Sequence, residues 1–186
     1  MGFHGYGESA EVEFERLQSI EGSEEWLIVA AQGLHRFYRR RTNEVVASWM
    51  TRQDRELAIE DNIAYSSAVL DAVANGTSPN VVFSGFSQGV AMAYRCATHV
   101  DHLVRGVISL GGDVPPELDT ARLKNISAAL LGRGDQDEWY TAEKLETDEK
   151  RLRAAGIDVR VARFQGGHEW TDAFQRAASD FLRSCR

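Results

Sequence analysis

Cysteine and proline are scarce in this chain of 186 residues. The two cysteines, Cys96 and Cys185, are too few for a disulfide framework and wrongly spaced for a zinc site. Only three prolines occur, and no low-complexity or linker segment divides the sequence. Because the length suits one folding unit with a sizeable core, we expect a single domain over residues 1–186.

The chain also lacks a basic excess and a long apolar run. Its 21 Lys and Arg stand against 28 Asp and Glu, so the formal net charge is −7. Proteins that bind nucleic acids need a basic surface that displaces counterions from phosphates. No stretch approaches the roughly 18 apolar residues of a membrane span, and the first residues lack the pattern of a secretory signal. We expect a cytoplasmic protein that binds no nucleic acid and does not span a membrane.

Short apolar runs alternate with segments of helical pattern. Asp54 and Thr141 are the expected N-caps of two helices, and a third pattern runs from Glu169 to Cys185. The runs are typical of buried strands and cover residues 2–3, 26–31, 81–83, 104–110, 126–131 and 157–164. This alternation predicts an α/β fold with a parallel sheet of about six strands and helices on both faces.

One pentapeptide carries a chemical signal. Gly85-Phe86-Ser87-Gln88-Gly89 has the form G-x-S-x-G and lies between a strand pattern and a helical pattern. Small flanking residues allow a sharp turn that lifts the serine hydroxyl above the sheet, at the start of a helix. The context therefore indicates that Ser87 is a nucleophile. The alternative is a tight turn with an incidental serine.

A nucleophilic serine needs a histidine base, and the chain has five histidines. His168 follows two glycines between the last strand and the last helix, where its ring can reach the serine. The others are expected in buried packing (His4), an arginine-rich loop (His35) and a solvated helix end that resembles a metal site only superficially (His99 and His102). We expect His168 to be the base and no metal to be bound.

Three carboxylates are candidates for orienting that histidine. Asp113, Asp135 and Asp137 each follow an expected strand, and the carboxyl ends of parallel strands share one edge of the sheet. With an aspartate from the 135–137 pair, the order along the chain is Ser, Asp, His, as in α/β-hydrolases. The residues alone leave the choice among the three open.

Five segments spread along the chain match the motifs of one family. They are His4–Glu8 (H-G-x-G-D/E), Ser48-Trp49 (S-W), 85–89 (G-F-S-Q-G), Leu130–Asp137 (an apolar strand, then H-G-x-x-D, with Arg133 where the family usually has His) and Gly166–Glu169 (G-G-H). The sequence thus resembles the phospholipase/carboxylesterase family of the α/β-hydrolases, small serine esterases that include acyl-protein thioesterases. The resemblance implies an α/β-hydrolase fold. Because little sequence precedes the first motif, we expect the N-terminal strands to be shortened.

The resemblance also implies the roles of individual residues. Ser87 would be the nucleophile, His168 the base and Asp137 the acid that orients it. The backbone N–H groups of Tyr6 and Gln88 would form the oxyanion hole. The mechanism that it implies needs no cofactor.

The expected substrates are short to medium acyl carboxylic esters, with thioesters and lysophospholipids as further candidates. Trp49, Trp139 and Trp170 flank the catalytic segments and are candidate pocket walls, with ordinary core packing as the alternative. The basic cluster at residues 36–41 is either a solvated loop or a site that captures an anionic group. The alternative function is a catalytically silent hydrolase fold that binds small molecules.

Overall fold

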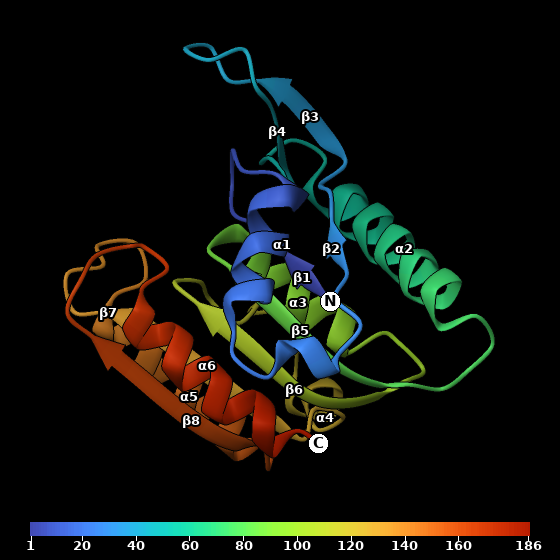
Figure 1. Cartoon of the computed structure of the whole chain (residues 1–186). Helices are drawn as coiled ribbons and strands as arrows, with labels where there is room; N and C mark the ends of the chain where they lie inside the picture. Colours follow the sequence, from blue (N-terminus) through green and yellow to red (C-terminus); the bar gives the residue numbers. More distant parts are fainter.

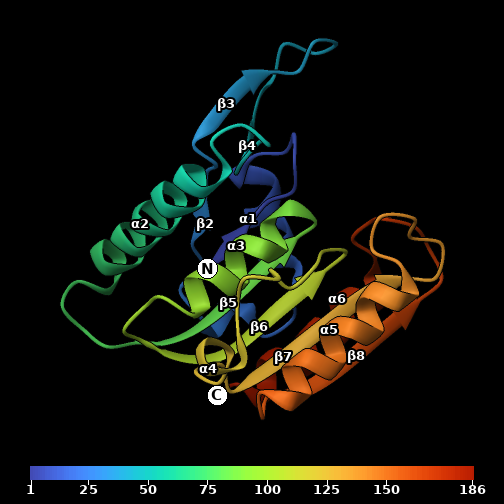
Figure 2. The same ribbon diagram turned by 180° about the vertical axis from the view of Figure 1, so that it is seen from behind.

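The computed structural model describes residues 1–186 as a six-stranded sheet between two layers of helices (Figures 1 and 2). The strand order is β2-β1-β5-β6-β7-β8, and every neighbouring pair is parallel. The strands are β1 (Gly2–Phe3), β2 (Ala30–Ala31), β5 (Asn80–Phe86), β6 (Leu103–Leu110), β7 (Ala128–Gly134) and β8 (Asp158–Phe164). The predicted fold class is confirmed, and the first two strands are short, with two residues each.

Helices bury an apolar core on each face of the sheet. Two helices cover the face at the front of Figure 1: α1 (Ala10–Ser19) and α6 (Asp172–Ser184). Three cover the face at the front of Figure 2: α2 (Arg55–Ala74), α3 (Gln88–Ala97) and α5 (Ala142–Ala154). The short helices η1 (Ser23–Glu25) and α4 (Thr120–Leu123) lie in connections. No helix of the structure is long and apolar enough to cross a membrane.

Capping side chains define the starts of several helices. Thr141 and Thr171 accept hydrogen bonds from the first turns of α5 and α6, so the expected cap at Thr141 is confirmed. Asp54 precedes α2 as expected, but its φ is 49° and its side chain makes no capping hydrogen bond. The last helix begins at Asp172, three residues after Glu169, because Thr171 is its cap.

Three features differ from the sequence analysis. Helix α1 was not predicted. The run at 26–31 is a strand only at Ala30–Ala31. The stretch expected to be an arginine-rich loop forms an antiparallel hairpin, β3 (His35–Tyr38) and β4 (Val45–Ser48), which projects from the body (Figure 1). All four residues of β3 are exposed, so its sequence lacks the apolar alternation that marks a strand.

Candidate active site

Ser87 lies on the turn between β5 and α3 in an unusual backbone conformation. Its φ is 53° and its ψ is −117°, a combination in which a residue other than glycine is strained. Its N–H donates to the carbonyl of Leu110 at 2.8 Å, which ties the turn to the end of β6. This is the strained strand-to-helix turn that the G-x-S-x-G pattern predicts.

The two glycines of the motif allow other backbone atoms to approach closely. A Cβ on Gly85 would lie 2.5 Å from the carbonyl carbon and oxygen of Gly89. A Cβ on Gly89 would lie 1.9 Å from the carbonyl oxygen of Phe3 in β1. Because neither distance is compatible with a side chain, the turn that carries Ser87 packs directly on itself and on the neighbouring strand.

We expect Gly89→Ala to destabilise the fold by about 2–3 kcal/mol, because β1 or α3 must shift to admit the methyl group. Gly167→Ala is the matched control, since a Cβ there would meet no atom within 4 Å. The control should change the free energy of unfolding by less than about 0.5 kcal/mol. Urea unfolding followed by tryptophan fluorescence measures both variants. Equal stabilities would contradict the packing described here.

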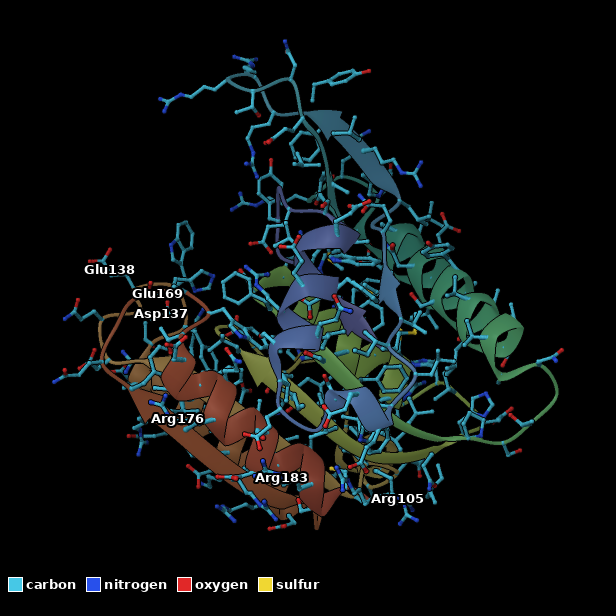
Figure 3. All side chains as sticks on the ribbon, viewed as in Figure 1. Arg105, Asp137, Glu138, Glu169, Arg176 and Arg183 are labelled. Atoms are coloured by element: carbon cyan, nitrogen blue, oxygen red, sulfur yellow. The ribbon has the colours of Figure 1, made fainter.

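The ring of His168 and the carboxylate of Asp137 are in direct contact. Nδ1 of His168 is 2.8 Å from Oδ2 of Asp137, and the Asp137 side chain is 1% exposed. Oδ1 of Asp137 accepts the N–H groups of Trp139 and Tyr140 at 2.8 and 2.9 Å. Figure 3 shows Asp137 and Glu169, the residue after His168, close together in the loops that follow β7 and β8. With Nδ1–H donating to the carboxylate, Nε2 is the nitrogen free to accept a proton.

The other two candidate acids have different partners. Oδ1 of Asp135 accepts the N–H of Gly166 at 3.1 Å. Oδ2 of Asp113 pairs with Nζ of Lys144 at 3.2 Å. Of the three candidate acids, Asp137 is the one whose carboxylate contacts the His168 ring.

Two glycines at the end of β6 lie between Ser87 and His168. A Cβ on Gly111 would be 2.9 Å from the His168 ring, and a Cβ on Gly112 would be 2.3 Å from the Ser87 carbonyl oxygen. The ring of Phe86 lies 5.0 Å from the His168 ring, centroid to centroid. No hydrogen bond joins the Ser87 hydroxyl to the ring, and in enzymes without substrate this bond is often long. The serine and the histidine thus flank one segment of backbone.

The loop His4–Glu8, which follows β1, presents a free backbone donor. Three of its five N–H groups donate within the protein, whereas those of His4 and Tyr6 have no protein acceptor. The Glu8 carboxylate fixes the loop by accepting the Gly5 N–H at 2.8 Å and two bonds from Arg16 at 2.7 Å. Burial alone would raise the pKa of Glu8, but the Arg16 guanidinium holds it below its usual value.

Gln88 joins the Ser87 turn to the end of the β3–β4 hairpin. Its Oε1 accepts the Trp49 N–H at 2.8 Å and the Ser48 hydroxyl at 3.2 Å, and its Nε2 donates to the Met50 carbonyl at 3.0 Å. These bonds fix the first residue of α3, whose backbone N–H is the second expected oxyanion donor. This role of the Gln88 side chain was not predicted from the sequence.

Of the three tryptophans expected as pocket walls, only Trp139 lines the cavity that contains Ser87. Trp49 is fully buried, and its Nε1 donates to the His4 carbonyl at 2.8 Å, so it supports the Tyr6 loop from the core. Trp170 packs edge-on against a phenylalanine of α6 and lies outside this cavity. The assignment of Trp49 and Trp170 to that pocket is therefore wrong. Sequence alone does not separate them from Trp139, because large aromatic residues serve both roles.

The cavity beside Ser87 has a volume of about 350 Å³. Only four of its 14 lining residues are hydrophobic, whereas Arg55, Arg95, Lys144 and Asp113 also line it. An apolar cavity of about 290 Å³ lies elsewhere, beside the amino end of β5, and contains none of the predicted site residues. The charged lining was not predicted from the sequence, because its members lie far apart along the chain.

The basic cluster at 36–41 does not line the cavity beside Ser87. It lies on β3 and the following turn, where every residue is exposed. Arg39 donates to the Gly7 carbonyl at 2.5 Å and pairs with Glu44 at 3.3 Å. The ring centroids of Tyr6 and Phe37 lie 5.6 Å apart, with the two rings tilted relative to each other. The hairpin therefore contacts the loop that carries the Tyr6 N–H and keeps most of its arginines in solvent.

Arg133 positions the loop that carries Asp137. Its guanidinium donates to the carbonyls of Tyr140, Asp135 and Asp137 at 2.8, 3.3 and 3.4 Å. Three bonds from one side chain hold the loop in a single conformation. The only sequence signal for this role is the position of Arg133 in the H-G-x-x-D segment, where the family has histidine.

The buried carboxyl group of Asp148 supports the segment after β6 that lines the cavity. Asp148 of α5 accepts the Val114 N–H at 2.9 Å and the Tyr140 hydroxyl at 3.2 Å. Burial raises the pKa of Asp148 to about 6. Arg151 also donates to the carbonyl of Val114 at 2.9 Å. These contacts fix the segment that follows β6 and lines the cavity.

Three of the four remaining histidines have structural partners, and His35 is exposed on β3. His4 is fully buried, as expected, and its Nε2 accepts the Gly33 N–H at 3.0 Å. Nδ1 of His99 lies 2.7 Å from the Arg95 carbonyl, and His102 lies 3.2 Å from Asp71. No group of three or more His, Cys, Asp or Glu side chains is arranged to hold a metal ion.

Comparison with known proteins places these features in a family context. A family model described as Phospholipase/Carboxylesterase matches residues 3–186. Three solved structures share the fold: SOBER1 of Arabidopsis thaliana (TM-score 0.77, 19% identity, covering 99% of this chain and 96% of that chain), a carboxylesterase of Bacillus cereus (0.73, 18%, 98% and 87%) and acyl-protein thioesterase 2 of Zea mays (0.69, 17%, 99% and 91%). Comparison with curated protein sequences gave no match.

Proposed function

The chain belongs to the phospholipase/carboxylesterase family, which supports a hydrolase of the esterase or thioesterase type, and on this premise we propose that it is a serine hydrolase of short to medium acyl carboxylic esters. One observation carries the proposal. A strained Ser87 and a His168–Asp137 pair joined at 2.8 Å lie at the same edge of the parallel sheet. Thioesters and lysophospholipids are further candidate substrates.

In the proposed mechanism, Ser87 forms a covalent acyl-enzyme. Its Oγ attacks the ester carbonyl carbon while Nε2 of His168 takes the hydroxyl proton. The imidazolium then gives this proton to the departing alcohol or thiol. A water molecule attacks the acyl-enzyme by the same route and returns Ser87 to its free form. Asp137 holds the ring in the required tautomer and stabilises its positive charge.

The N–H groups of Tyr6 and Gln88 are the proposed donors to the oxyanion. Support comes from the Tyr6 N–H, which has no acceptor in the protein, and from the fixed position of Gln88 at the start of α3. The loss of one such donor costs about 3 kcal/mol of transition-state stabilisation in well-studied enzymes. The N-terminal end of a helix favours the same negative charge.

Rates over a series of 4-nitrophenyl esters test the substrate class. We expect the highest kcat/KM on short to medium chains, because the cavity beside Ser87 holds only about 350 Å³. The sequence has no insertion between Val104 and Asp137 or between Asp137 and His168 that is long enough for a large lid, so dissolved monomers should be good substrates. A sharp rise in rate when the ester forms droplets would contradict this. The alternative, a catalytically silent binding module, predicts no turnover of any ester in the series.

A further inference from the structure

Three cationic side chains gather in the cavity beside Ser87. Arg55 comes from the first residue of α2, Arg95 from α3 and Lys144 from α5. The whole chain has a formal net charge of −7, so this concentration of positive charge runs against the balance of the molecule. A cavity lined by one sign of charge raises the local concentration of ligands of the opposite sign.

Two carboxylates compensate part of this charge. Nε and Nη2 of Arg95 donate to Oε1 of Glu117 at 2.9 and 2.5 Å. Nζ of Lys144 pairs with Oδ2 of Asp113 at 3.2 Å and donates to the Trp139 carbonyl at 2.8 Å. Three cations therefore share two carboxylates, which leaves the cluster a net charge of +1.

The uncompensated donors belong to the two arginines. The guanidinium group of Arg55 makes no hydrogen bond in the protein. Its nearest acidic atom is Oε2 of Glu117, which lies 3.7 Å from Nη2 of Arg55. Arg95 is only 2% exposed, and its Nη1 has one contact, with the sulfur of Met50 at 3.9 Å. A sulfur at that distance is a poor substitute for an oxygen acceptor. Guanidinium groups with free N–H donors match the paired oxygens of a carboxylate or phosphate.

We propose that this cavity binds an anionic group of the substrate, so that esters carrying a carboxylate or phosphate are cleaved in preference to neutral esters of the same size. The inference rests on the proposed function and adds the substrate class. Arg55 and Arg95 receive the carboxylate or phosphate oxygens of the substrate, and Lys144 adds a further positive charge to the cavity. The basic cluster at 36–41 does not contribute to this anion site, since none of its residues lines the cavity.

Two pairs of matched esters test the preference. The first pair is 4-nitrophenyl hydrogen glutarate and its methyl ester, which differ by an anion in the acyl part. The second is 4-butyryloxybenzoate and its methyl ester, which differ by an anion in the leaving group. We expect kcat/KM to be at least about tenfold higher for the anionic member of one pair, a difference of about 1.4 kcal/mol. Inorganic phosphate should compete with that substrate, and added salt should reduce the preference.

Variants separate the cavity from the overall charge of the protein. Arg55→Gln and Lys144→Gln should lower the ratio of anionic to neutral kcat/KM severalfold. Arg52→Gln is the matched control, because Arg52 is exposed and lies outside the cavity. Its ratio should equal that of the wild type. Equal ratios in Arg52→Gln and Arg55→Gln would overturn the assignment of the site.

The remaining outcomes distinguish a failure of the proposed anion preference from a failure of the proposed serine hydrolase function. If neutral and anionic esters are cleaved equally well in both pairs, the cavity does not select anions and the inference fails, while the proposed serine hydrolase stands. If no ester of either pair is cleaved, the proposed function fails and the inference fails with it. The salt dependence of the wild type needs no variant, so a poorly folded variant does not prevent a decision.

Discussion

Replacing Ser87 by alanine should abolish ester hydrolysis and labelling by a fluorophosphonate probe. We expect kcat to fall by a factor on the order of 10⁵ to 10⁶, because the residual rate would come only from binding and oxyanion stabilisation. Ser87 alone among the serines has a positive φ and lies on the turn into α3. Mass spectrometry of the labelled protein identifies the modified residue. Activity on 4-nitrophenyl esters measures the loss of turnover.

Ser184→Ala is the control for this experiment. Ser184 is exposed at the end of α6, does not line the cavity beside Ser87, and donates only to the Phe181 carbonyl at 2.7 Å. This variant should keep full labelling and full turnover. If the Ser87 variant were labelled to the same extent as the wild type, another side chain would be the nucleophile and the proposed mechanism would be wrong.

The parts of the fold that were predicted correctly are those with a strong local pattern. Strands buried on both faces, such as β6 and β7, appear in the sequence as continuous apolar runs, and their parallel pairing follows from the helices between them. The Ser87 turn also has a local pattern, because Gly85 is required by the backbone of Gly89 and Val90, although Gly89 is required by Phe3 in the neighbouring strand β1. For such features the chain itself carries the constraint.

The β3–β4 hairpin was missed for the opposite reason. Every side chain of β3 is exposed, so His35-Arg36-Phe37-Tyr38 shows no alternation of apolar and polar residues. Its pairing with β4 depends instead on contacts such as the bridge between Glu8 and Ala47, which join segments almost 40 residues apart. A pattern within one short segment does not report contacts of that kind.

The lining of the cavity was also beyond local analysis. The sequence drew attention to adjacent arginines at 36–41, but the cations beside Ser87 are Arg55, Arg95 and Lys144, which three different helices bring together. Likewise, Trp49 and Trp139 both lie next to site segments in the sequence. Only packing decides that the first is buried in the core and the second is 76% exposed at the cavity.

The site depends on groups that do not take part in the proposed chemistry. Arg133 holds the loop of Asp137 through three carbonyls, and Gln88 ties the start of α3 to residues 48–50. Such bonds keep reacting groups in position before substrate arrives, which reduces the reorganisation required in the transition state. This explains why His168 and Ser87, which share no hydrogen bond, are nevertheless held beside the same two glycines.

Asp137→Asn should lower kcat by a factor of about 10⁴, as the loss of the carboxylate does in serine proteases. The reason is the tautomer of His168. An amide that replaces Oδ2 with an NH₂ group turns a donor toward Nδ1, so the proton moves to Nε2 and the ring no longer accepts one from Ser87. Asp135→Asn is the matched control, because its amide oxygen still accepts the Gly166 N–H, and its kcat should fall by less than about tenfold. Measurements of kcat on one ester for both variants, with thermal unfolding as a check on folding, decide the assignment. If the Asp135 variant lost as much activity as the Asp137 variant, the contact of 2.8 Å between Asp137 and His168 would not be the one that matters for turnover.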